Sequence, residues 1–264
     1  MKNVLLVLIA GLSISLLPSC QKDVNTETIV ETDTVTIDLK RGLIAYYPFS
    51  GNTGDSSGNN KHGVAMNGLS YSTDAQDSAN KAANFDGVDD YINIVDATNY
   101  FAPPKMSISF QFNLRDINTR AAMLCKSAFT TPSSVSWSAG IPLDGDQRFA
   151  YSVANGDNPC GGIWATANGA GYVMQNNTAL QNNKWYHVTM IFNLGVQMTY
   201  INGQLVQAHV GNYSYLNQCS DANLRMGGWW QNDIISIDGK IDEVRIYNRI
   251  LAENEIEKLA TEIN

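Results

Sequence analysis

The chain has 264 residues, with 25 acidic side chains against 17 lysines and arginines and a formal net charge of −8 at pH 7. This acidic balance argues against a nucleic-acid partner, because phosphates attract basic surfaces, and it slightly favours neutral ligands. Hydrophobic residues make up 44% of the chain and charged residues 16%, as in folded proteins, and the length allows one large β domain or two small ones.

The first twenty residues have the organisation of an export signal. Lys2 gives a basic start, residues 4–17 are apolar, and Pro18-Ser19 precede Cys20. The apolar run is too short to span a membrane. The segment resembles a bacterial lipoprotein signal. The resemblance implies that residues 1–19 are a signal peptide removed by cleavage, and that Cys20 is lipidated and its new amine acylated, for example with palmitate. The protein would then be lipid-anchored in the bacterial cell envelope.

Residues 20–39 are rich in threonine and acidic residues and contain no aromatic side chain. Because such a composition buries little apolar surface, we predict a tether that holds a domain of residues 40–264 away from the lipid. The pair Lys22-Asp23 resembles the charged tag of lipoproteins that are sent to the surface of the outer membrane. This resemblance implies an outer-membrane location with exposure at the cell surface.

Short β-rich segments alternate with turn clusters from residue 42 onward. We predict strands over 43–49, 82–85, 91–94, 106–114, 120–126, 134–141, 148–153, 162–165, 185–192, 197–201, 204–209, 224–230 and 239–248. Asn202-Gly203 lies between two of them and is the strongest two-residue hairpin signal. Ile241 and Val244 cannot both face the core in strict alternation, which predicts a β-bulge that redirects Asp242.

Residues 251–259 place apolar side chains at helical spacing and predict one short C-terminal helix. The strands, short and regularly spaced, predict an all-β fold: a two-sheet antiparallel jelly-roll sandwich with the helix packed on it.

Three cysteines remain after Cys20. Cys160 and Cys219 lie in loop-like segments, and an exported chain permits disulfides, so we predict the pair Cys160–Cys219. Cys125 follows an apolar segment and is expected to be a buried strand thiol. The spacing of these cysteines does not match a zinc site.

Seven motifs follow one another in the predicted domain: LIAYYPF (43–49), DSSGN (55–59) with HG (62–63), ANFDGVDDYI (83–92), MSISF (106–110), WYHV (185–188), YING (200–203) and GKIDEVRIYNR (239–249). Together they resemble the LamG-like jelly roll, a branch of the concanavalin A-like lectin/glucanase sandwiches. The resemblance implies two packed antiparallel sheets, one of them often concave and presenting a carbohydrate or protein ligand site. A fold alone does not imply a function.

Catalysis by paired glutamates is not supported by the sequence. Glucanases of this superfamily carry two glutamates close together on one strand, and the chemistry needs two carboxylates that flank the scissile bond. Between Leu39 and Leu251 the chain has a single glutamate, Glu243, and it lies in a motif that matches the non-catalytic family pattern. We therefore expect a protein without enzyme activity.

A structural calcium site is one interpretation of the oxygen-rich loop that contains Asp55 and Asn59. Calcium prefers six to eight oxygen ligands, and Asp242 on the last strand could add a carboxylate. Relatives of this family often bind calcium in this region. The alternative is an Asx-type turn, in which these side chains cap their own backbone, and the sequence leaves both interpretations open.

Exposed aromatic side chains are candidates for stacking on sugar rings, with Asn, Asp and either Arg148 or Arg225 binding hydroxyls. Trp185 is expected to be buried, because it alternates with His187 and core residues in the WYHV motif. Trp229 and Trp230 are adjacent in a predicted strand and would point to opposite faces. The candidate ligand-binding residues are Trp137, Trp164, Trp229, Trp230, Asn232 and Asp233.

The function that these observations favour is non-catalytic binding of a glycan or glycoprotein by a lipid-anchored, exported module. The membrane would be reached through the lipid on Cys20, and no nucleic acid is expected as a partner. Two alternatives stay open: an adhesion or scaffold module that binds protein, and, less favoured, an unusual enzyme acting on polysaccharides.

Overall fold

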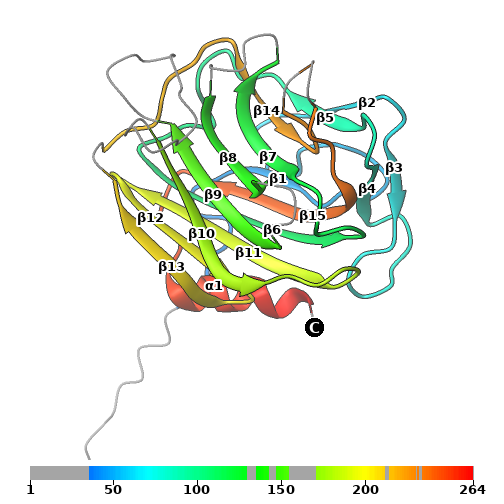
Figure 1. Ribbon diagram of the computed structural model, residues 1–264. Coiled ribbons are helices and arrows are strands. Elements are labelled where there is room, and N and C mark those ends of the chain that lie inside the picture. The colour runs from blue at the N-terminus through cyan, green and yellow to red at the C-terminus, as the bar shows by residue number, and fades with distance from the viewer. Residues whose placement is uncertain are drawn as a thin grey trace, which may run out of the picture. The chain divides into compact units, whose positions relative to one another are not determined.

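Two antiparallel sheets face each other in the domain (Figure 1). The computed structural model describes residues 36–129, 135–142, 147–154, 171–211, 214–229, 231 and 234–263, with backbone alone for 171–178 and 263. Ile37–Asn264 forms one compact unit. In these ranges no helix has the length and apolar character that crossing a membrane requires.

The strands of the described ranges are short except near the centre of each sheet. They are β1 (Leu43–Tyr47), β2 (Val64–Met66), β3 (Ser70–Ser72), β4 (Ala82–Asp86), β5 (Tyr91–Ile94), β6 (Lys105–Leu114), β7 (Ala121–Ala128), β8 (Val135–Ile141), β9 (Arg148–Ala154), β10 (Gly171–Ala179), β11 (Trp185–Asn193), β12 (Val196–Ile201), β13 (Gln204–Val210), β14 (Ala222–Met226) and β15 (Asp238–Tyr247). The helix α1 (Glu253–Ala260) and a 3-10 turn, η1 (Thr261–Ile263), follow them.

The eight-stranded sheet has the order β13-β12-β11-β6-β15-β4-β3, with β1 paired to β15. The seven-stranded sheet has the order β10-β9-β8-β7-β14-β5-β2. Alternating side chains of both sheets point between them and form the core, which includes Phe110 and Phe112 on β6, Trp137 on β8 and Phe149 on β9. The predicted two-sheet antiparallel sandwich is confirmed.

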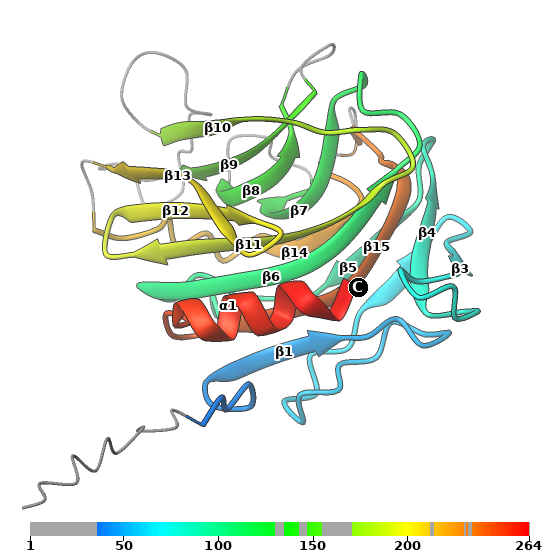
Figure 2. The ribbon, with the colours of Figure 1, turned by 90° about the horizontal axis from the view of Figure 1, so that it is seen from below.

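The helix α1 covers part of the outer face of the eight-stranded sheet, the face directed away from the seven-stranded sheet (Figure 2). Its Ile256 and Leu259 pack against Ile191, Tyr200 and Tyr247 of that face. The apolar residues whose spacing predicted a helix over 251–259 are therefore the ones that pack on the sheet.

Two local predictions about the backbone are confirmed. The turn between β12 and β13 has positive φ at both Asn202 (50°) and Gly203 (80°), as a two-residue hairpin requires. On β15 the register shifts between Asp242 and Arg245, and Glu243 has a φ of 53° at the bulge.

Some predicted strands differ from the structure. β14 ends at Met226 because Gly227 follows with a φ of 82°, so Trp229 lies beyond the strand and the predicted strand over 224–230 is too long. The short strands β2 and β3, and the longer β10, were not predicted. The predicted strand over 162–165 lies outside the described residues.

Candidate ligand-binding site

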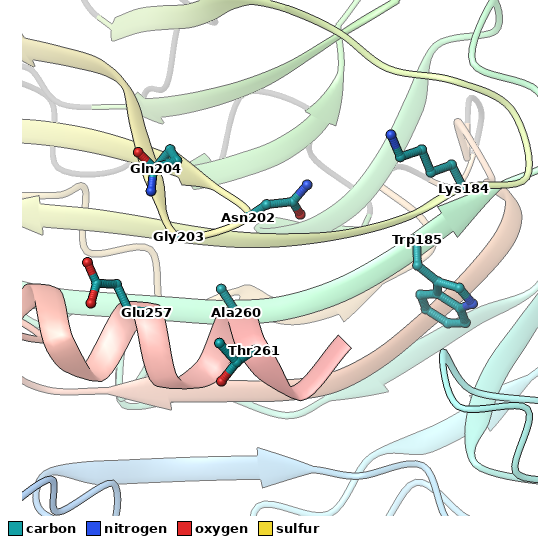
Figure 3. Close-up of a pocket in the computed structure, with 8 residues that line it drawn as sticks. All are labelled: Lys184, Trp185, Asn202, Gly203, Gln204, Glu257, Ala260 and Thr261. Carbon is teal, nitrogen blue, oxygen red and sulfur yellow. The ribbon is translucent and has the colours of Figure 1, made fainter. Parts of the chain in front are cut away.

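A pocket of about 430 Å³ lies where the β12–β13 hairpin, the start of β11 and the end of α1 meet (Figure 3). This volume is in the range of small-molecule sites. The lining residues come from three separate parts of the chain: Lys184, Trp185, Asn202, Gly203, Gln204, Glu257, Ala260 and Thr261.

Trp185 supplies the aromatic surface of this pocket. The next residue, Tyr186, faces the core, so strand alternation directs Trp185 to the outer face of the sheet. Its side chain is partly exposed, and Lys240 Nζ lies 5.9 Å from the ring centroid. The expectation that Trp185 is buried is therefore wrong. Trp185 is the first residue of β11, and α1 does not cover the outer face of the sheet there.

The hairpin turn is held in place by its own side chain. Asn202 Oδ1 accepts a hydrogen bond from the His187 N–H (2.9 Å), and the Asn202 N–H donates to the His187 carbonyl (2.8 Å). A Cβ on Gly203 would lie 3.3 Å from the Ala260 Cβ, so glycine allows the turn to approach α1 closely. These contacts form a rigid base beneath the exposed side chains.

The pocket combines one ring with side chains that donate and accept hydrogen bonds. Gln204 and Glu257 are exposed around it and bring an amide and a carboxylate to the lining. The Lys184 side chain extends away from Trp185 in Figure 3, and its Nζ lies 5.4 Å from the centroid of the core-facing Tyr186 ring. An indole presents an apolar face that stacks on flat, apolar faces of a ligand, and polar groups around it fix the ligand's orientation. Such a set suits a polar, uncharged ligand with apolar ring faces.

Trp137 does not form part of any surface. Its side chain is 0% exposed, and its Nε1–H donates to the Phe101 carbonyl (2.8 Å) inside the core. The prediction of Trp137 as a ligand contact is therefore corrected: on β8 it faces the same side as Ala139 and Ile141, which is the interior.

Arg225 is also unavailable to a ligand. It is buried, its guanidinium Nη1 donates to the Ser127 and Trp229 carbonyls (2.6 and 3.2 Å), and it stacks 4.7 Å from the Phe129 ring centroid. Arg148 is partly buried at the start of β9.

Trp229 is partly exposed, and its carbonyl also accepts from the Ser127 hydroxyl. Trp229 stays a predicted ligand contact. The remaining predicted positions, Trp164, Trp230, Asn232 and Asp233, lie outside the described residues, as does Cys20.

Two cysteine predictions can be compared with the structure. Cys125 is a buried free thiol on β7, as expected, and burial raises its pKa. Cys219 is disulfide-bonded. Its predicted partner, Cys160, lies outside the described residues, so the pairing stays a prediction.

The predicted calcium ligands are engaged in hydrogen bonds of their own. The Asp55 carboxylate accepts from the backbone N–H groups of Tyr46, Ser57 and Lys61 at 2.8–3.0 Å, the arrangement of the turn interpretation. Asn59 Nδ2 donates to backbone carbonyls of β1. Asp242 is 3% exposed and accepts from the Glu243 N–H (2.7 Å). Calcium at these residues stays a prediction.

A serine–histidine contact is present but buried. Ser109 Oγ and His187 Nε2 are 2.8 Å apart on the outer face of the eight-stranded sheet, and His187 is 1% exposed. Burial lowers the pKa of His187 to about 3, so the ring is neutral at physiological pH. Because substrate cannot reach this pair, we assign it no catalytic role.

Residues 86–257 match the family described as the concanavalin A-like lectin/glucanases superfamily. A search of curated proteins finds no match. Among solved structures, domain 4 of AbnA, a GH43 extracellular arabinanase from Geobacillus stearothermophilus, in complex with arabinotriose, is 18% identical with a TM-score of 0.61, covering 83% of this chain and 98% of that one.

The binding domain of botulinum neurotoxin DC is also similar in structure. In complex with SialylT it is 15% identical with a TM-score of 0.63, and in complex with rat synaptotagmin II it is 16% identical with a TM-score of 0.64. The matches cover 86% of this chain but only 52% and 53% of the neurotoxin chains, about half their length. By its family match, the chain belongs to the concanavalin A-like lectin/glucanases superfamily.

Proposed function

We propose that this protein is a non-catalytic binding module for glycans and that the Trp185 pocket is its binding site. The observation that carries the proposal is the partly exposed Trp185 ring on a pocket whose other lining groups are amide, hydroxyl and charged side chains. A pyranose or furanose ring offers apolar C–H faces to the indole and hydroxyls to these polar groups. The net charge of −8 is compatible with a neutral sugar.

The similar structures support a binding role. The arabinanase domain is in complex with arabinotriose, and cell entry of botulinum neurotoxin type C, which has a similar structure, depends on interaction with two ganglioside molecules. A second candidate function, binding of a protein, is favoured by the complex of a neurotoxin binding domain with synaptotagmin II. The absence of paired glutamates between Leu39 and Leu251 favours binding over hydrolysis.

We further propose that the module is attached to the outer membrane through lipid on Cys20. Because a single shallow pocket binds weakly, a high density of anchored copies would raise the apparent affinity through avidity. Mass spectrometry of the protein purified from membranes tests the anchor, since diacylglycerol and an amide-linked acyl chain on Cys20 add a defined mass.

Affinity electrophoresis of the protein against a panel of neutral polysaccharides tests the glycan proposal. We expect retardation without release of products. Trp185→Ala is expected to weaken binding about tenfold or more, because an aromatic contact contributes about 0.5–1.5 kcal/mol beyond its buried area. Trp185→Phe, which keeps a ring, is expected to retain part of the affinity.

Trp229→Ala is the matched control, since it removes an equally large side chain from a different predicted site. Retardation that is lost in Trp229→Ala and kept in Trp185→Ala would assign the site to the segment after β14 instead. No retardation of the folded protein by any glycan, together with capture of a protein ligand, would replace the glycan proposal by the protein-binding one.

A further inference from the structure

Three carboxylates converge in the turn that joins β4 to β5. Asp86, Asp89 and Asp90 each place an oxygen so that the three oxygens lie within 4.8 Å of one another. Asp86 is exposed, Asp89 is partly exposed and Asp90 is only 3% exposed. No basic side chain of the described residues forms an ion pair with them. Three negative charges at this separation repel one another strongly unless a cation or protons balance them.

A second observation concerns hydrogen bonding rather than charge. Asp90 Oδ2 accepts from the Asp86 N–H (3.2 Å), but Asp90 Oδ1 is buried and receives no hydrogen bond from the described part of the chain. A buried oxygen without a partner is costly, and the cost is larger for a charged group. The turn therefore contains a buried acceptor to which a ligand can bind.

The surrounding contacts hold the turn in this shape. Asn67 Nδ2 donates to the Asp89 carbonyl (2.8 Å), and Ser236 Oγ donates to the Asp90 carbonyl (3.4 Å). Gly87 has a φ of 81°, which allows the tight reversal between the carboxylates. Asp86 also lines a pocket of about 230 Å³ together with Asp116 and Asp238.

We propose that Asp86, Asp89 and Asp90 form a calcium-binding site. All the converging ligand atoms are carboxylate oxygens, which suit a hard cation, and ligands on opposite sides of Ca²⁺ at about 2.3–2.6 Å would be up to about 5 Å apart. Calcium accepts irregular and bidentate carboxylate geometry, as three ligands from one five-residue turn require, whereas Mg²⁺ demands a near-ideal octahedron. Water would complete the coordination on the exposed side.

The site differs from the one predicted at Asp55, Asn59 and Asp242. There, backbone N–H groups already satisfy the Asp55 carboxylate, whereas Asp90 Oδ1 has no donor within the described ranges. The position also gives the ion a structural role. β4 belongs to the eight-stranded sheet and β5 to the seven-stranded sheet, so an ion in this turn fastens the two sheets together where the chain crosses between them (Figure 1).

Calorimetric titration of the EDTA-treated and dialysed full-length protein with CaCl2 tests the proposal. We expect one saturable site with much weaker binding of MgCl2. Loss of an outer-shell partner weakens metal sites about 10–100-fold, so loss of a ligand in Asp89→Asn is expected to weaken calcium binding at least about tenfold. Asp116→Asn, in the adjoining pocket, and Asp242→Asn, in the other predicted site, are the matched controls and should bind calcium as the wild type does.

Thermal unfolding provides a second readout, because a bound ion raises the melting temperature. Added calcium should raise the melting temperature of the wild type but not that of Asp90→Asn. The proposal is overturned if the wild type binds no calcium, or if Asp89→Asn and Asp90→Asn bind it unchanged. It is equally overturned if Asp116→Asn or Asp242→Asn abolishes binding.

Discussion

Two buried carboxylates, one inside the sandwich and one on the outer face of the eight-stranded sheet, are stabilised in different ways. Asp96 pairs with Lys126 at 2.8 Å, both side chains have no exposed surface, and Lys126 also donates to the Ala222 carbonyl (2.7 Å). The Tyr100 and Phe101 N–H groups donate to the same carboxylate. Asp96 is therefore matched by a cation and by backbone donors.

Asp242 has no such match. The nearby Arg245 pairs with Glu243 (2.5 Å) and Glu262 (3.0 Å), and it leaves Asp242 with only the Glu243 N–H as a donor of the described chain. Burial first, and then Glu243, raise the pKa of Asp242 to about 8. Below that pH the folded protein holds Asp242 as a neutral acid.

The comparison shows that a buried carboxylate needs either a matched cation or loss of its charge. Asp96 has a cation from the chain, whereas Asp242 keeps a proton. Asp90, which lies among two further carboxylates, represents a third solution if calcium binds there as we propose. Three sets of variants distinguish these solutions. They remove the cation that pairs with Asp96, the carboxyl of Asp242, or the Tyr46 hydroxyl that donates to Glu243.

Removal of the cation from the matched pair should have the largest effect. Lys126→Ala leaves Asp96 buried without its counterion, and breaking one half of a buried ion pair costs about 3–5 kcal/mol. We expect a loss of this size in the free energy of unfolding, measured by urea denaturation at pH 7. The double variant Lys126→Met with Asp96→Asn is the control, because it removes both charges. It should recover much of the loss, and equal destabilisation in both proteins would contradict the pairing.

Removal of the charge from Asp242 should change how stability depends on pH. In the unfolded chain this carboxyl ionises near its ordinary pKa of 3.8, whereas in the folded chain it keeps its proton to about pH 8. Its ionisation therefore favours unfolding, and its contribution to stability falls as pH rises from about 4 to 8 and is constant above that.

We expect Asp242→Asn to gain stability relative to the wild type over this interval, by about 4 kcal/mol between pH 5 and pH 9. Urea denaturation of both proteins at these two pH values measures the difference. Asp116→Asn, at a partly exposed carboxyl, serves as a control and should show no such gain. A difference between Asp242→Asn and wild type that is the same at both pH values would show that Asp242 is ionised in the folded state.

Loss of the hydroxyl that donates to Glu243, the residue after Asp242, should have the smallest effect on stability. The Tyr46 hydroxyl donates one bifurcated hydrogen bond to the Glu243 carboxylate, whose oxygens lie 2.8 and 3.0 Å away, and Arg245 lies 4.5 Å from the Tyr46 ring centroid. Tyr46→Phe keeps the ring over Arg245 and loses the hydrogen bond, which costs about 1 kcal/mol. Tyr46→Leu, which also loses the ring, should cost more. Equal melting temperatures for Tyr46→Phe and wild type would assign the stabilisation to the ring alone.

Much of the fold could be predicted because strands, turns and the helix leave local signals. Alternation with period 2 located most strands to within two residues, the Asn202-Gly203 pair located the hairpin, and the spacing of Ile241 and Val244 revealed the bulge. The strands β2 and β3 were not predicted, because three residues are too few to show a period. Each of these features depends on neighbours along the chain.

The candidate binding site is formed by segments that are far apart in the sequence, so it could not be predicted from local patterns. Alternation separates the two faces of a strand but does not say which face another layer covers, so Trp137 and Trp185 were assigned in reverse. The pocket exists because α1 stops beside the β12–β13 hairpin, and Lys126 is buried because Asp96 lies opposite it. The sequence by itself determined the elements and the family motifs. Only the tertiary structure decided which side chains are covered, because burial and pairing arise between segments far apart in the chain.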